Sequence, residues 1–222
     1  MKSSKNVLLI VTVSVLVSGV CFGYEDEGFQ WWSKARASLD VTKDWKCAFE
    51  QEFRLGDDGG NLYYEHSELA FTYSGLAEWL DAGAGFRLIY EKDSSDDFKR
   101  ENMPYIVVTL KGRLFDLPVS TRSRIEYRDR TAKEDVWRYR NKITVKLPVE
   151  LTPLKLKPYL ADEIFITLND DNVDKNRLYL GAALPLSQSV EAEIFYMWQT
   201  SRVASGDWSD IQVLGTTLKF KF

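Results

Sequence analysis

From about residue 31 to its end, the chain alternates apolar and polar residues with a period of two. The last fourteen residues, 209–222, show this most clearly, with Phe222 and Phe220 on one face and Lys221 and Lys219 on the other. Such alternation predicts a β-strand with one apolar and one polar face. Eleven segments of this kind can be counted, and no helical period is found after residue 24. The pattern therefore predicts an all-β fold.

Three features of the segments distinguish a closed membrane barrel from a soluble β-sandwich. They run for about ten to twelve residues, the length of a tilted transmembrane strand, whereas globular strands average about five or six. Short and long connections alternate, as in outer-membrane barrels, and one long charged loop is expected at 92–102. Trp208 lies in a loop, and the other six tryptophans lie at segment ends, which indicates an interfacial aromatic belt. These six are Trp31, Trp32, Trp45, Trp79, Trp137 and Trp198.

We therefore expect a single closed antiparallel transmembrane β-barrel of about 10–12 strands. The count of eleven conflicts with this fold, because single-chain bacterial barrels have an even number of strands. The connections make the first segment run parallel to the last, and residues 24–30 are too few for another full strand. Either a segment has been split or missed, or the first one is not a wall strand.

The chain ends on an aromatic residue, although the last residues of a soluble protein usually fray. This ending resembles the closing strand of bacterial outer-membrane barrels, in which the terminal aromatic residue is the recognition tag for insertion. The resemblance marks Phe220 and Phe222 as an assembly signal. It implies the lipid bilayer and the barrel assembly machinery as partners. A soluble sandwich that ends on a core strand is the alternative for this strand taken alone.

The N-terminus predicts a secretory signal peptide. Two lysines precede an apolar run at 7–17 that is too short to span a bilayer, and small residues follow it. We expect cleavage after Gly23, which gives a signal peptide of residues 1–23 and a barrel of residues 24–222. A lipoprotein anchor at Cys21 is the alternative. Together with the barrel, the peptide predicts location in the bacterial outer membrane.

Composition excludes several kinds of partner and site. The chain has 29 basic and 33 acidic residues, a formal net charge of −4, and an acidic balance disfavours nucleic acid as a partner. After cleavage Cys47 would be the only cysteine, so no intramolecular disulfide or thiolate metal cluster could form. His66 is the only histidine, which excludes a multi-histidine metal site. We expect a monomer without a metal or cofactor.

The most informative chemical signal is a ladder of basic residues on the polar faces of three consecutive segments, which in a barrel point into the lumen. The ladder consists of Lys111, Arg113, Arg122, Arg124, Arg128, Arg130, Arg138, Arg140, Lys142 and Lys146. Acidic residues occupy polar faces elsewhere: Glu50, Glu52, Glu68, Asp81, Glu191 and Glu193. A cationic wall would then face an acidic one. The barrel could be plugged by its own salt bridges, or it could be a narrow channel whose arginines pass anions.

A lipid hydrolase of the outer membrane is the second alternative. Such an enzyme needs a Ser–His pair oriented by a third group. Glu68 could orient the ring of His66, but Ser67 points to the opposite face. We therefore expect a hydrogen-bonded histidine in the lumen. The function predicted is that of a non-enzymatic barrel, structural or passing small solutes through a charged lumen.

Several short motifs resemble a bacterial outer-membrane family known only as a domain of unknown function, number 2490. Residues 175–181, Lys-Asn-Arg-Leu-Tyr-Leu-Gly, are similar to an Asn-Arg-x-x-x-Gly stretch of that family. The resemblance spans most of the mature chain and implies an outer-membrane barrel, but it supplies no activity and no catalytic residue. The other similar positions are Pro158 and Tyr159 with Glu163 and Phe165, the Trp-Arg-Tyr-Arg stretch at 137–140, and Glu50 to Arg54.

The eighth segment, about 156–166, is the least regular. Asp162 shares its apolar face with Leu160 and Ile164, and one charge on such a face predicts a β-bulge or a change of register nearby.

Overall fold

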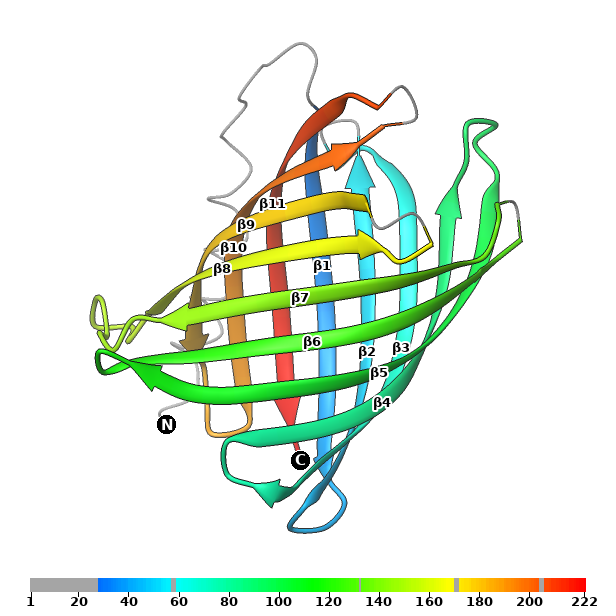
Figure 1. The fold of residues 1–222 in the computed structure, drawn as a ribbon. Coiled ribbons are helices and arrows are strands. Elements are labelled where there is room, and N and C mark those ends of the chain that lie inside the picture. Colours follow the sequence, from blue (N-terminus) through cyan, green and yellow to red (C-terminus); the bar gives the residue numbers. More distant parts are fainter. Residues whose placement is uncertain (1–27, 57–58, 132, 170–171, 204–205) are drawn as a thin grey trace, which may run out of the picture.

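Eleven strands form one closed barrel in the computed structural model of the chain, which describes residues 28–56, 59–131, 133–169, 172–203 and 206–222 (Figure 1). In this part of the chain, no helix has the length and apolar character needed to cross a membrane. The predicted signal peptide, residues 1–23, lies outside the described residues. The strands are β1 (Phe29–Asp40), β2 (Trp45–Gly56), β3 (Asn61–Ala77), β4 (Leu80–Lys92), β5 (Phe98–Leu114), β6 (Leu117–Arg130), β7 (Val136–Lys146), β8 (Lys157–Thr167), β9 (Asn172–Pro185), β10 (Val190–Arg202) and β11 (Trp208–Lys221).

Each strand pairs with the next one in the chain, and β1 pairs with β11. The consecutive pairs are all antiparallel. The closing pair is parallel, from Phe29 opposite Gln212 to Ser38 opposite Lys221. Strand direction alternates around such a barrel, so an odd number of strands must close on a parallel pair. The first segment is therefore a wall strand, and the count of eleven is confirmed although bacterial barrels usually have an even number of strands.

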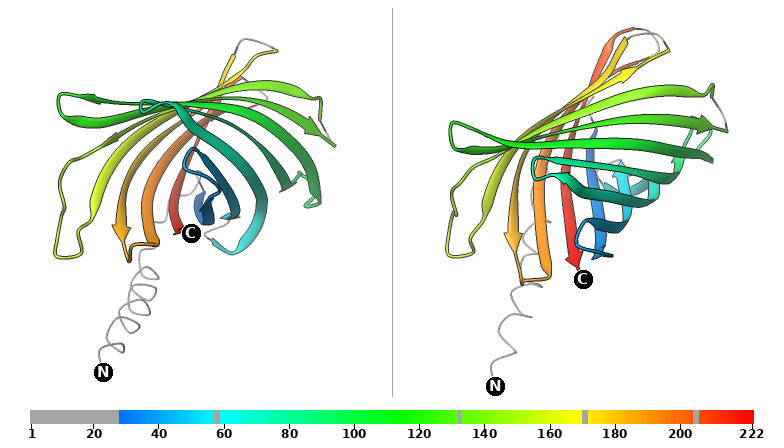
Figure 2. Two further views of the ribbon diagram at one scale, coloured as in Figure 1. Left: turned by 90° about the horizontal axis from the view of Figure 1, so that it is seen from below. Right: turned by 60° about the horizontal axis from the view of Figure 1, so that its bottom comes forward.

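The C-terminus is part of this closing seam. The amide of Phe222 donates a hydrogen bond to the carbonyl oxygen of Ser38 at 2.9 Å. The Ser38 hydroxyl donates to the carbonyl oxygen of Phe220 at 3.2 Å. Figure 2 shows the C-terminus beside the connection between β1 and β2. We call this end of the barrel, with the connections 41–44, 78–79, 115–116, 147–156 and 186–189, the Phe222 end.

Side chains alternate between an apolar outside and a charged inside. Phe49, Phe71 and Leu180 are exposed on the outer surface, whereas Glu50 and Arg177 are buried in the lumen. This distribution is the inverse of that in a water-soluble protein, where charged residues are rarely buried and large apolar patches are rarely exposed. The period of two thus separates two environments over the whole circumference.

The connections differ from the expected alternation of short and long loops. The longest one, 147–156, lies at the Phe222 end, and those at the opposite end have four or five residues each. The charged stretch at 92–102 is not a long loop, because β5 already begins at Phe98. The Glu101 carboxylate is buried and accepts hydrogen bonds from Arg128 at 2.6 Å. Its charge marks a position that faces the lumen.

Most tryptophans lie near the two rims of the outer surface. Trp45, Trp79, Trp137 and Trp208 are exposed at or near strand ends. Trp208 is the first residue of β11, so its expected position in a loop is wrong. Trp32 is buried in the lumen and does not belong to an outer belt. The alternation explains this, because its neighbour in sequence occupies the outer face.

The charged position on the apolar face of β8 stays on the outer surface. A register irregularity is present between Phe165 and Ile166 on the ladder with β9. It follows Asp162 in the chain and does not turn it inward. Instead, the side-chain amide of Asn176 donates a hydrogen bond to the Asp162 carboxylate at 2.9 Å. The carboxylate is thus paired on the outside of the barrel.

Aromatic side chains fill the lumen above glycines of neighbouring strands. In three places an inward-facing ring stands directly opposite a glycine, and a Cβ on that glycine would lie well inside van der Waals contact with the ring. The missing side chain therefore makes room for the ring, as aromatic cover of strand glycines does elsewhere. The pairs are Tyr105 over Gly85, Tyr159 over Gly181 and Phe195 over Gly215.

Candidate functional site: the charged lumen

A chain of ion pairs begins on the lumen face of the first four strands. Glu50 of β2 is 3.2 Å from both the Lys34 ammonium and the Arg36 guanidinium of β1. Arg87 of β4 lies 3.9 Å from the same carboxylate. Arg87 Nε also donates a hydrogen bond to Glu68 of β3 at 2.8 Å. Two acids and three cations thus connect β1, β2, β3 and β4.

The chain continues across the lumen to β6, β7 and β8. Arg124 of β6 is 3.3 Å from Glu68 and 3.6 Å from Glu126. Arg140 of β7 is 3.8 Å from Glu126, and its Nε donates to Glu163 of β8 at 2.6 Å. Acidic and basic side chains therefore alternate along this part of the wall. Such alternation is what a low-dielectric interior requires, because each buried charge needs a partner of opposite sign.

Glu163 connects the chain of ion pairs to β9 and β10. The Tyr179 hydroxyl donates to its Oε2 at 2.7 Å, and the Arg177 guanidinium lies 3.7 Å from the same oxygen. Arg177 Nε donates to the side-chain oxygen of Gln199 at 2.7 Å. We call the whole set the lumen network: Lys34, Arg36, Glu50, Glu68, Arg87, Arg124, Glu126, Arg140, Glu163, Arg177, Tyr179 and Gln199.

The middle of the lumen is filled with side chains. Glu126 and Glu163 face inward and have 0 % of their surface accessible to water. Met103 and Met197, also inside the barrel, are equally inaccessible. Side chains that lined a continuous water-filled path would be reached by water. At this level the barrel is therefore packed.

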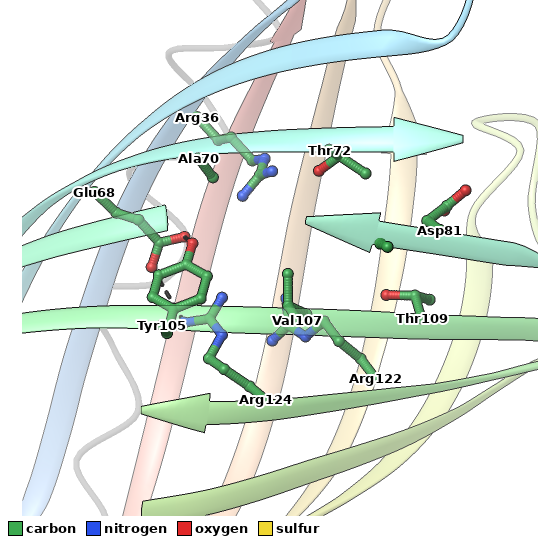
Figure 3. Close-up of a pocket in the computed structure, with 11 residues that line it drawn as sticks. Arg36, Glu68, Ala70, Thr72, Asp81, Tyr105, Val107, Thr109, Arg122 and Arg124 are labelled. Carbon is green, nitrogen blue, oxygen red and sulfur yellow. Dashed lines mark hydrogen bonds and ion pairs between the residues drawn. The ribbon is translucent and has the colours of Figure 1, made fainter. Parts of the chain in front are cut away.

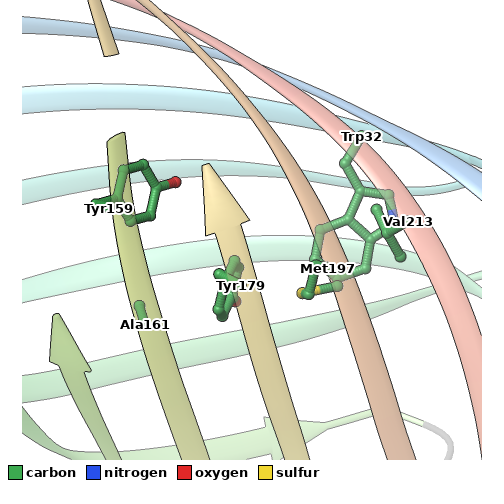
Figure 4. Close-up of a cluster of buried hydrophobic side chains, with 6 residues drawn as sticks. All are labelled: Trp32, Tyr159, Ala161, Tyr179, Met197 and Val213. Carbon is green, nitrogen blue, oxygen red and sulfur yellow. The ribbon is translucent and has the colours of Figure 1, made fainter. Parts of the chain in front are cut away.

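An aromatic layer lies beside the lumen network. The Arg54 guanidinium lies between the rings of Trp32 and Tyr64, 3.7 Å and 3.8 Å from their centroids. Arg54 also donates to Glu52 at 2.7 Å. Trp32 belongs to a buried apolar cluster that spans β1 and the strands from β8 to β11 (Figure 4). The cluster contains Trp32, Tyr159, Ala161, Tyr179, Met197 and Val213.

The lumen is hollow toward the Phe222 end. A cavity of about 520 Å³ extends from Trp32 and Arg177 to Lys146 and Lys157 at the strand ends. Among the described residues that line it, eleven are basic and four are acidic. A smaller cavity of about 190 Å³ adjoins it and shares the side chain of Arg122. Figure 3 shows arginines of β1 and β6 around this smaller space. The hollow part of the lumen is thus strongly cationic.

The chain matches the family described as "Protein of unknown function (DUF2490)" over residues 29–210, from the start of β1 into β11. The chain belongs to this family. A comparison with curated proteins finds no match. In the DUF2490 barrel, the motifs that suggested the resemblance lie in or beside the lumen network. Glu163 binds Arg140, Phe165 lies 4.7 Å below the Arg177 guanidinium, and Tyr159 covers Gly181.

The predicted basic ladder divides into two groups in the DUF2490 barrel. Five members face the middle of the lumen: Arg122, Arg124, Arg138, Arg140 and Lys142. The other five lie toward the ends: Lys111 pairs with Asp81 at 2.8 Å, Arg113 donates to the Asp116 carbonyl, Arg128 pairs with Glu101, Arg130 donates to the Glu134 carbonyl, and Lys146 lines the larger cavity.

The acidic residues do not form a separate wall. Glu126 and Glu163 lie among the arginines of β6, β7 and β9, and neither belongs to the acidic set predicted from the sequence. Both occupy polar-face positions, which is the signal that could have found them. The physical reason for the mixing is that a purely cationic wall would be unstable inside the barrel. Of the predicted acids, Glu50 and Glu68 belong to the lumen network, and Glu52 pairs with Lys34 beside it. Asp81 pairs with Lys111, and Glu191 and Glu193 both pair with Lys219.

His66 is buried among acids. Its Nε2 is 3.3 Å from Glu50, and its Nδ1 is 3.9 Å from Glu52. Ser67 lies on the outer face, where it donates to Gln51 at 2.5 Å. Glu68 contacts Arg87 rather than the histidine ring. The three groups of a Ser–His–acid arrangement are therefore not brought together here.

The same residues come close enough to hold a metal ion, since one atom each of Glu50, His66 and Glu68 lies within 4.8 Å of the others. Both carboxylates, however, already face cationic side chains. Arg87 lies beside both of them, and Lys34 lies beside the first. A divalent cation would be repelled by these groups, so the electrostatics of this cluster disfavour a metal site.

Proposed function

We propose that this DUF2490 protein is a non-enzymatic β-barrel of the bacterial outer membrane. Its apolar outer surface and strands of 11 to 17 residues support this placement, because a tilted strand needs about 9–11 residues to cross a bilayer. Exposed tryptophans at the rims fit the two membrane interfaces. The proposal includes a monomeric state, with Phe220 and Phe222 as the signal for the assembly machinery.

We further propose that the barrel is closed to the flow of ions. The observation that carries this is the complete burial of Glu126 and Glu163 in the middle of the lumen. Their salt bridges satisfy charges that a water-filled pore would leave hydrated. The cationic cavity is lined at the Phe222 end by Lys146 and Lys157, and solutes would enter the lumen there without crossing it.

A planar-bilayer recording tests the closed lumen. The purified protein should give no unitary conductance steps, while its gel mobility changes on boiling, as expected of a folded barrel in the same preparation. The quadruple variant R122E/R124E/R138E/R140E should lose thermal stability and also fail to conduct. Regular steps with anion preference, inverted in this variant, would instead establish a narrow anion channel.

Cell fractionation and a lipase assay test the other two parts. The protein should sediment with the outer membrane, and recovery in the soluble periplasmic fraction would contradict the placement. The purified protein should not hydrolyse phospholipid. Hydrolysis that disappears in a His66→Ala variant would establish the enzyme alternative, for which the placement of His66 between two acids offers no nucleophile.

A further inference from the structure

Two like-charged side chains stand directly opposite each other in the lumen. Arg122 of β6 is the cross-strand partner of Lys142 of β7, and both line the larger cavity. Like charges in this arrangement destabilise a sheet unless a counter-charge lies between them. The nearest carboxylate to Arg122 is that of Glu163, at 4.0 Å. Among the described residues, none offers Lys142 a carboxylate at salt-bridge distance, and its ammonium lies 3.6 Å above the ring of Tyr179.

Glu163 is already occupied by other partners. It accepts hydrogen bonds from Arg140 at 2.6 Å and from Tyr179 at 2.7 Å. One carboxylate therefore cannot also neutralise the two cations on the cavity side. The positive charge of Arg122 and Lys142 is not balanced at hydrogen-bond distance within the described part of the chain.

The neighbouring pair on the same two strands is built differently. Arg124 stands opposite Arg140, which is again a pair of like charges. Here each guanidinium has its own acid: Arg124 lies 3.3 Å from Glu68, and Arg140 donates to Glu163 at 2.6 Å. The chain thus supplies counter-charges in the packed middle of the lumen. It leaves them out at the next inward-facing pair, Arg122 and Lys142, although all four side chains line one or both of the cavities.

The cavity offers further groups for an anion. Ser120 and Thr144, which are cross-strand partners, line it on the side of the Phe222 end. Their hydroxyls can donate hydrogen bonds. Lys146 and Lys157 lie at its mouth, where positive charge raises the local concentration of anions. The arrangement combines a planar guanidinium, an ammonium and hydroxyls around one space.

We propose that this cavity binds a small soluble phosphate-bearing anion between Arg122 and Lys142, entering from the Phe222 end. A guanidinium holds two phosphate oxygens at once, and an ammonium acts as a point charge. A phosphate group has further oxygens for the hydroxyls, whereas a carboxylate has only two. The barrel wall encloses the cavity, which favours a soluble molecule over a lipid headgroup with its acyl chains. This inference rests on the closed lumen proposed above, since the packed middle makes the cavity a pocket.

Thermal unfolding of the full chain in phospholipid-free detergent tests the proposal, with tryptophan fluorescence as the signal. Inorganic phosphate should raise the melting temperature by about 2–4 °C at about five times its Kd, relative to chloride at equal ionic strength. The double variant R122Q/K142Q should lose this rise. Its melting temperature in chloride should equal or exceed that of the parent, because the repulsion is removed.

The matched control is K111Q/R113Q, which removes one lysine and one arginine from the same ladder. These residues are partnered by Asp81 and the Asp116 carbonyl and lie outside both cavities. The control should keep the full phosphate-dependent rise. Loss of the rise in the control as well would show a nonspecific effect of charge and overturn the site.

Three other outcomes would overturn the proposal. The first is equal stabilisation of R122Q/K142Q and the parent by phosphate, or no stabilisation of either. The second is a lower melting temperature of R122Q/K142Q in chloride, since the pair would then not be a repulsive one. The third is stabilisation by phosphatidylglycerol vesicles but not by inorganic phosphate, which would assign the charge to lipid headgroups. None of these outcomes contradicts the proposal that the lumen is closed to ions, because conductance is measured separately.

Discussion

At the scale of single residues, the Glu163 carboxylate of β8 is held by side chains of both neighbouring strands. It contacts Arg140, Arg177 and the Tyr179 hydroxyl and is inaccessible to water. Removing its charge would leave buried cations without compensation, which typically costs 3–5 kcal/mol. We therefore expect Glu163→Gln to lower the free energy of unfolding by about 3–5 kcal/mol. Urea titration of the folded barrel, followed by tryptophan fluorescence, measures the loss.

The adjacent residue supplies the control. Asp162 lies on the outer face and accepts a hydrogen bond from Asn176, which an amide oxygen can also accept. Asp162→Asn should change the free energy of unfolding by no more than about 0.5 kcal/mol. Comparable losses in the two variants would mean that β8 does not separate an inside from an outside at this point.

At the scale of elements, the strands fit together through rings that cover glycines. Tyr159 of β8 lies over Gly181 of β9, and its hydroxyl donates to Glu193 of β10. A methyl group at Gly181 would displace the ring, and overpacking of this kind costs about 1–3 kcal/mol. We expect Gly181→Ala to destabilise the barrel by that amount in urea titration. Gly112→Ala on β5 should be neutral or stabilising, because nothing lies within 4 Å of its added Cβ.

A double-mutant cycle separates ring displacement from a backbone effect. In a Tyr159→Ala background the space above Gly181 is empty, so Gly181→Ala should cost little. An undiminished cost there would show that the glycine is required by the backbone and not by the ring.

Much of this architecture could be predicted from the period of two. It predicts which side chains of each strand face the lumen, including both members of the Arg122–Lys142 pair. The pattern is ambiguous where a polar residue fits either a loop or the lumen face of a strand. The stretch at 92–102 has the charged composition of a loop. Glu101 nevertheless belongs to β5 and pairs with Arg128 inside the barrel. The count of eleven also implies that the first and last strands run parallel, as they do. Bacterial barrels have an even number of strands, so the sequence alone left the role of the first segment open.

At the scale of the whole molecule, the partners across the lumen could not be predicted. They depend on the strand number and stagger, which together set the diameter of a barrel. Glu68 meets Arg124, 56 residues away in the chain, only because β3 and β6 curve around the same interior. The sequence therefore identified the lumen residues without showing that the acids and arginines interleave. This interleaving packs the lumen around Glu126 and Glu163, which water does not reach.

The apolar exterior leads to the last prediction. Leu180 is the ninth residue of β9, 60 % exposed, and lies opposite the exposed Leu160 and Tyr196. If this surface meets hydrocarbon, Leu180→Arg should cost about 2–4 kcal/mol in lipid vesicles. Leu186, 46 % exposed in the connection at the Phe222 end, would lie near the membrane interface. There the same change should cost only about 0–1 kcal/mol.

The comparison between these two leucines depends on depth in the bilayer and not on exposure alone. Folding equilibria in urea with lipid vesicles measure both variants under the same conditions. A soluble barrel would tolerate arginine equally well at the two sites, because both side chains are open to the surroundings. Equal and small costs would therefore contradict the membrane placement. A large cost at Leu180 alone would locate the hydrocarbon layer around the middle of β9, at the level of the packed lumen.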